Sequence, residues 1–111
     1  MTTITDEYMQ EMLTKTKEYC FVLLKPGRND NPENLQQMIW EHARRNFALR
    51  ADGLLPIVCP ATKQTGVSGL YIFNATEEEA KKIMDDDPAV KAGIFIYGIH
   101  PCRSFPGDSL P

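Results

Sequence analysis

The apolar and polar positions of this chain follow two spacings, one typical of strands and one typical of helices. Short apolar runs that are rich in strand-forming residues predict four strands, at residues 19–25, 54–59, 67–74 and 93–100. Apolar residues spaced three and four apart predict three helices, at residues 5–17, from Asn31 to about Ala51, and from Thr76 to the residue before Pro88.

Glycine and proline mark the ends of several of these elements. Asn31-Pro32 is predicted to cap a helix and to place proline at its first position, after a polar loop that runs from Arg28 to Pro32. Gly53 suits the left-handed conformation that often ends a helix. Pro88 is predicted to stop a helix, because the residue before proline avoids the helical region. Pro56 favours an edge position for the strand at 54–59.

The elements occur in the order helix, then β-α-β-β-α-β, which is the order of the ferredoxin-like α+β fold. Strands this apolar on both sides cannot leave the second face of their sheet in water. We therefore expect a second copy of the chain, the N-terminal helix at 5–17, or both to cover that face. Residues 1–111 are predicted to form a single domain with a core at 19–102 and a tail at 103–111, the chain being extended from Pro101 onward.

Composition narrows the possible partners and location. The chain has 111 residues and a formal net charge of −3, which disfavours nucleic acid as a partner. No apolar run approaches the roughly 18 residues of a membrane helix, and the polar segment from Met1 to Glu7 lacks the features of a signal peptide. Three widely spaced cysteines, an odd number, favour reduced thiols and a cytoplasmic location.

Metal and cofactor sites are not expected. The spacing of His100 and Cys102 is too tight for the usual zinc sites, and Cys59 is far from both in the sequence. Nucleotide-binding glycine motifs and the nucleophile motif of hydrolases are missing from the sequence. The expectation is therefore that the protein uses neither a metal nor an organic cofactor.

Two residues could carry acid–base chemistry. His42 lies at the margin of the apolar stripe of the second helix, which consists of Leu35, Met38, Ile39, Ala43 and Phe47. An imidazole can take and return a proton at cellular pH. The alternative is a half-buried boundary histidine that serves packing. Asp87 could orient such an imidazole and stabilise its protonated form. Otherwise it belongs, with Asp85 and Asp86, to a solvated acidic helix end.

Two further positions could bind a substrate. Arg44 and Arg45 follow the histidine, and a guanidinium that reached a pocket could bind a carboxylate or a phenolate. We assign this role to Arg45, although an exposed helix face is the simpler interpretation for both arginines. Ser68 stands between glycines in a strand, where a ligand can approach the backbone closely. The alternative is a role in sheet packing alone.

The chain resembles the YciI-like (YCII-related) proteins of the dimeric α/β-barrel superfamily over about residues 19–102. Three motifs carry the resemblance, namely Glu41-His42-Ala43-Arg44 about ten residues before Asp52-Gly53-Leu54, Gly66-Val67-Ser68-Gly69, and Asp86-Asp87-Pro88-Ala89-Val90-Lys91-Ala92-Gly93. Many relatives carry an acidic residue two positions before the helix-ending glycine. Here that position is Ala51 and the acid stands at Asp52, which argues against a role for Asp52.

The resemblance implies a homodimer in which two ferredoxin-like units pair sheet against sheet. It also implies a pocket between sheet and helices, with His42 and Asp87 as the acid–base pair. The chain is thus expected to be a small enzyme of the isomerase or lyase type that acts on an unknown small organic molecule. The alternative is a non-catalytic dimeric module that binds a small ligand or a partner protein.

Overall fold

The structure of the chain is a computed structural model that describes residues 1–29 and 31–111. Asp30, within the predicted polar loop, lies outside the described residues. The elements in chain order are α1 (Asp6–Leu13), β1 (Lys17–Pro26), α2 (Leu35–Ala51), β2 (Ile57–Pro60), β3 (Gly69–Phe73), α3 (Glu77–Asp85), α4 (Pro88–Lys91) and β4 (Phe95–Ser104).

The strands form one antiparallel sheet in the order β2-β3-β1-β4, which confirms the predicted ferredoxin-like α+β fold. β1 pairs with β4 along its whole length, from Lys17 opposite Ser104 to Pro26 opposite Phe95. The fourth strand, predicted to end at residue 100, therefore continues through Pro101 to Ser104. A proline is tolerated there because β4 is an edge strand.

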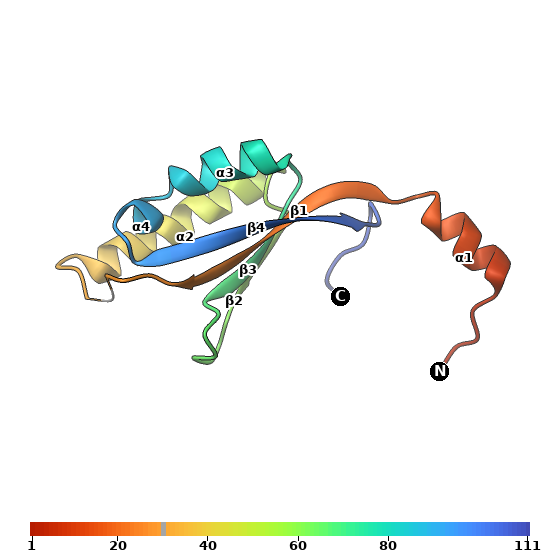
Figure 1. Cartoon of the computed structure of the whole chain (residues 1–111), viewed down its shortest axis with the longest axis horizontal. Coiled ribbons are helices and arrows are strands. Elements are labelled where there is room, and N and C mark those ends of the chain that lie inside the picture. The colour runs from red at the N-terminus through yellow and green to blue at the C-terminus, as the bar shows by residue number, and fades with distance from the viewer. Residues whose placement is uncertain (30) are drawn as a thin grey trace.

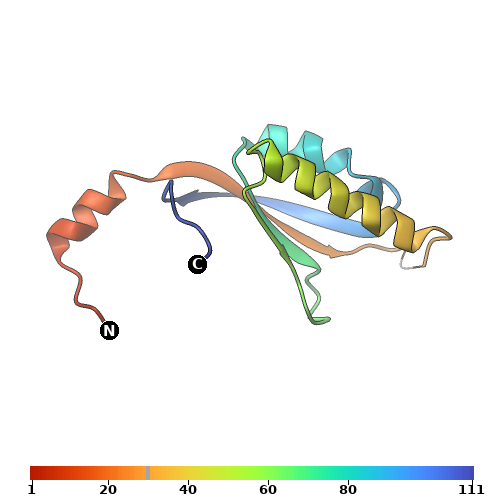
Figure 2. The same cartoon turned by 180° about the vertical axis from the view of Figure 1, so that it is seen from behind.

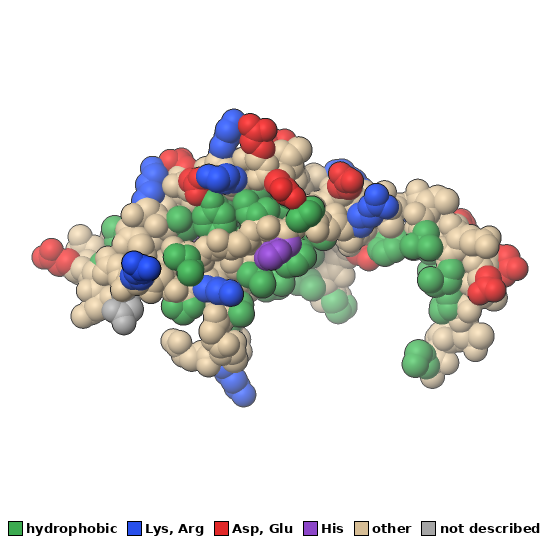
Figure 3. All heavy atoms as spheres, viewed as in Figure 1, with side chains coloured by type: hydrophobic (Ala, Val, Ile, Leu, Met, Phe, Trp, Pro, Cys, Tyr) green, Lys and Arg blue, Asp and Glu red, His purple; other side chains and the backbone are tan. Residues whose placement is uncertain are grey.

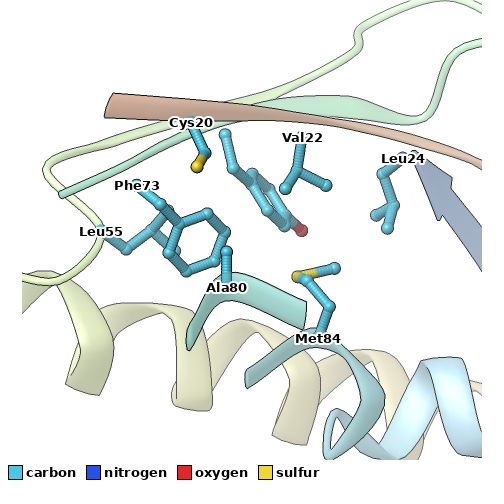
Figure 4. Close-up of a cluster of buried hydrophobic side chains, with 8 residues drawn as sticks. Cys20, Val22, Leu24, Leu55, Phe73, Ala80 and Met84 are labelled. Atoms are coloured by element: carbon cyan, nitrogen blue, oxygen red, sulfur yellow. The ribbon is translucent and has the colours of Figure 1, made fainter. Parts of the chain in front are cut away.

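α2 and α3 lie side by side on one face of the sheet, and the hydrophobic core fills the space beneath them (Figure 1; Figure 2). Alternate residues of β1 point into this core. Figure 4 shows the core side chains, which come from β1, β3, α3 and the segment before β2. They are Cys20, Val22, Leu24, Leu55, Tyr71, Phe73, Ala80 and Met84.

The opposite face of the sheet is apolar and half-exposed. Phe21 and Leu23 of β1 alternate with the core residues and lie beside Ile72 and Leu70 of β3. At the edge of the same face Ile96 keeps 55% of its surface exposed. Within the described residues, no helix lies on this face (Figure 1; Figure 2). The expected N-terminal helix does not cover it.

α1 projects away from the sheet at the start of β1 (Figure 1). It ends at Leu13, because Lys17 already begins β1, so the helix predicted to reach residue 17 is shorter. Tyr8, Met9 and Leu13 are exposed, and Figure 3 shows hydrophobic side chains on the side of this segment that is turned toward the rest of the molecule. None of the helices in the described part of the chain is long and apolar enough to cross a membrane.

α2 begins later than predicted, and its most buried residues lie beside the predicted apolar stripe rather than within it. Its N-cap is Asn34, three residues after the predicted cap at Asn31, and its end before the left-handed Gly53 is as predicted. In the predicted apolar stripe Phe47 is 68% exposed, whereas the others are half-buried, namely Leu35, Met38, Ile39 and Ala43. The buried residues of the helix are polar: His42 and Asn46.

Candidate active site

His42 and Asp87 meet at the sheet side of α2. The Nδ1 atom of His42 lies 2.8 Å from the Oδ2 atom of Asp87, although the two residues are 45 positions apart in the sequence. The exposed fractions are 7% for His42 and 1% for Asp87. A charged group that is removed from water needs a hydrogen-bonding partner. The contact between His42 and Asp87 therefore holds both side chains in place.

Asp87 is also the N-cap of α4, a helix that the sequence reading did not predict. Its Oδ1 atom accepts hydrogen bonds from the backbone N–H groups of Ala89 (2.9 Å) and Val90 (3.2 Å), and Pro88 takes the first helical position. Burial by itself would raise the pKa of Asp87, but the hydrogen bond from His42, its charge and the two backbone donors together hold that pKa below its usual value. Asp87 is therefore a carboxylate at neutral pH.

Tyr71 and Asn46 complete the buried network on the other side of the imidazole. The hydroxyl of Tyr71 lies 2.8 Å from the Nε2 atom of His42, and the Nδ2 atom of Asn46 lies 3.1 Å from that hydroxyl and 3.3 Å from Nε2. Sequence reasoning missed both residues. Asn46 follows His42 by one helical turn, and Tyr71 stands two positions before Phe73 and so shares the core-facing side of β3, so each carried a usable signal.

When the His42 ring is neutral, the hydrogen bonds of this network fit one direction. A carboxylate can only accept, so we assign the proton of the neutral His42 ring to Nδ1, which donates to Asp87. The bare Nε2 then accepts from the Tyr71 hydroxyl, while the amide of Asn46 donates to the Tyr71 oxygen. Burial, opposed by the Asn46 hydrogen bond and reinforced by the charge of Asp87, raises the pKa of Tyr71 to about 12. The Tyr71 hydroxyl is therefore protonated at neutral pH, as this direction requires.

A groove of about 1110 Å³ opens beside the network. His42, Asn46, Tyr71 and the predicted substrate-binding residue Ser68 all line it. The ring of Phe95, another lining residue, lies 5.2 Å from that of His42.

The structure places Arg45 against the acidic residues. Its guanidinium nitrogens lie 3.7 Å from Asp87 Oδ2 and 3.8 Å from Asp86 Oδ2, and the residue is outside the set that lines the groove. The neighbouring Arg44 is exposed and contacts Glu41. Of the four predicted site residues, His42 and Arg45 both contact Asp87, and Ser68 joins His42 at the groove.

The remaining histidine and the cysteines lie apart from this network. His100 is exposed on β4 and its ring stacks on Phe21 at 4.8 Å between centroids. Cys20, Cys59 and Cys102 are free thiols. Across the described residues, no three histidine, cysteine, aspartate or glutamate side chains gather closely enough to hold a metal ion.

Comparison with known proteins identifies the family. A solved structure similar to this chain is 5-chloro-2-hydroxyhydroquinone dehydrochlorinase from Burkholderia phenoliruptrix, in complex with 2,5-dihydroxybenzoquinone. It is 22% identical, with 73% of this chain and 90% of that chain covered and a TM-score of 0.47. A search of curated proteins finds no match. The family model of the YCII-related domain matches residues 19–103. The chain therefore belongs to the YCII-related domain family.

Proposed function

We propose that this YCII-related protein is an enzyme that moves protons on a small organic molecule, in an isomerase or lyase type of reaction. His42 accepts and returns the proton, and Asp87 orients the ring and stabilises its charged form. One observation carries the proposal: a buried histidine–aspartate pair, with atoms 2.8 Å apart, belongs to a network that borders a groove large enough for a small molecule.

The lining of the groove supports a mainly apolar substrate with an acidic or polar group. Apolar side chains such as Leu24, Ile39 and Phe95 share the lining with Arg50 and with Ser68. We propose that the Ser68 hydroxyl contacts a polar group of the substrate. Arg45 is better suited to hold the Asp87 carboxylate than to bind substrate, since its guanidinium already faces that group.

Deuterium uptake tests the proposed activity. A panel of small ketones, unsaturated lactones and dihydroxybenzenes is incubated with the protein in deuterium oxide and followed by proton NMR. We expect the protein to catalyse exchange at a carbon of at least one compound, and the His42→Gln variant to be slower by about 100-fold, the low end of general acid–base catalysis.

The matched control is Asp86→Asn, which changes an exposed carboxylate next to the site and should leave the exchange rate unchanged. Exchange that persists in a folded His42→Gln protein would contradict the proposal. So would a panel in which no compound exchanges faster with the protein than without it.

We also propose that the protein is a homodimer that pairs its open sheet faces, as the dimeric α/β barrel requires. The apolar residues Phe21, Leu23, Leu70 and Ile72 support this, because they stand side by side on a face without a covering helix in the described structure. A contiguous apolar surface of this kind marks an interaction site in a protein that stays in solution. The same sheet face of a second copy of the chain is equally apolar, so the two faces can bury one another.

One observation favours the alternative of a non-catalytic interaction module. The exposed apolar residues of α1 point to a protein partner for that helix rather than to a lid over the groove. Binding of a panel compound without any exchange would support this alternative. A cytoplasmic location stays a prediction, and the three free thiols agree with it.

A further inference from the structure

Both ring nitrogens of His42 are already occupied. Nδ1 is held by Asp87, and Nε2 faces the Tyr71 hydroxyl at 2.8 Å and the Asn46 amide at 3.3 Å. A substrate that approached His42 directly would have to displace one of these partners from a buried position. An imidazole in this setting exchanges protons most readily with the group that it already contacts.

The Tyr71 oxygen is the atom of the network with spare capacity. A phenolic oxygen can donate one hydrogen bond and accept two. Here it donates to His42 Nε2 and accepts from Asn46 Nδ2 at 3.1 Å, which leaves one acceptor position. Tyr71 also lines the groove, so a molecule in the groove can supply the missing donor.

We propose that Tyr71 is the catalytic residue that touches the substrate, and that His42 acts through it. This inference rests on the proposed acid–base function. The substrate proton passes to the Tyr71 oxygen while the hydroxyl proton of Tyr71 passes to His42 Nε2. The electron pair of the broken bond stays on the substrate, and the imidazolium forms beside the Asp87 carboxylate. Reversal of the two transfers at another substrate atom completes an isomerisation.

The residues around Tyr71 and His42 stabilise the charges that this proton relay creates. Asn46 donates to the Tyr71 oxygen and so stabilises the negative charge that the oxygen carries during the transfer. Asp87 stabilises the positive charge that His42 gains. Tyr71 keeps its proton when the groove is empty, because burial raises its pKa to about 12. The relay is therefore reset to a neutral hydroxyl after each cycle.

The substitution Tyr71→Phe tests the relay, because it keeps the buried ring and removes only the hydroxyl. Exchange is measured with the panel compound, a small ketone, lactone or dihydroxybenzene, that wild type exchanges fastest. We expect Tyr71→Phe to lower the maximal rate by about 100-fold with little change in KM. The double variant Tyr71→Phe/His42→Gln should be no slower than the slower of the two single variants, because the two residues act as a unit. Tyr97→Phe, which removes a hydroxyl bonded to Asp85 outside the groove lining, is the matched control and should keep the wild-type rate.

The outcomes separate this inference from the proposed function. Loss of exchange in His42→Gln with wild-type exchange in Tyr71→Phe would overturn the role of Tyr71 and leave the enzyme proposal standing. A second measurement needs no substrate: nitrogen NMR of labelled protein should show the proton of neutral His42 on Nδ1. A proton on Nε2 would overturn the relay, because Tyr71 could then no longer donate to that nitrogen.

Discussion

The Asp87→Ala variant should lose about 3–5 kcal/mol of the free energy of unfolding, the range seen when one partner of a buried pair is removed. Asp87 accepts from His42 through one oxygen and from two backbone N–H groups of α4 through the other. Alanine leaves all three donors without their acceptor in a site that water reaches poorly, and it also removes a helix cap. Urea unfolding followed by circular dichroism measures the change.

Asp86→Ala is the control, because Asp86 is the neighbouring exposed acid and pairs with Lys91 and Arg45 at the surface. Its unfolding curve should stay close to that of wild type, since exposed ion pairs contribute little. If the two variants unfolded at the same urea concentration, Asp87 would not be the structural centre of the site.

The stability that Asp87 provides should depend on pH in a defined direction. The pKa of Asp87 is lowered in the folded protein, so the folded state favours the charged form more than the unfolded chain does. The contribution of Asp87 to the free energy of unfolding is fully present above the pKa of an ordinary aspartate, about 3.9. It is lost as the pH falls through the lower pKa that Asp87 has in the folded protein. Urea unfolding of wild type and Asp87→Ala between neutral pH and pH about 3 should show their difference shrinking only toward the acid end. A difference that shrank between pH 6 and 8 instead would assign the effect to another group.

The Leu23→Asp variant should convert the proposed dimer into a monomer. Leu23 stands at the centre of the open face, opposite Leu70 of β3 and Gly98 of β4. In a sheet-to-sheet dimer each subunit would bury an unpaired carboxylate there, at a cost of several kcal/mol, which weakens association by at least about 1,000-fold. Light scattering at micromolar concentration should give the 12.6 kDa monomer instead of twice that mass.

Trp40→Asp is the matched control, because it introduces the same charge at an exposed aromatic residue on α2. It should leave the dimer intact. Circular dichroism checks that both variants keep the fold. A monomeric wild-type protein, or dissociation caused by Trp40→Asp and not by Leu23→Asp, would contradict the proposed interface.

The order of the elements was predictable because the apolar runs and the turn residues agree along the chain. The pairing of His42 with Asp87 was predictable only from the family resemblance, because the residues alone left a packing role open for His42 and a solvated helix end open for Asp87. α4 was missed because the same Asp-Pro step can stop one helix and start another, and four residues are too few to show a helical period.

The face of α2 was misjudged for a physical reason. Hydrophobicity alone predicts that Phe47 is buried, but this helix buries His42 and Asn46 instead, because they satisfy one another and Tyr71 through hydrogen bonds. Such a network depends on a residue in β3 that no local pattern links to the helix. Functional sites are where the rule that apolar residues face inward is most often broken.

The single carboxylate of Asp87 couples the integrity of the site to the smallest helix of the fold. α4 has four residues, too few to persist without its cap, and the cap is also the group that holds His42. A local opening of α4 therefore disorders the imidazole even while the sheet and the larger helices remain folded. We therefore expect the site to be lost by local opening of α4 at a lower free energy than global unfolding requires.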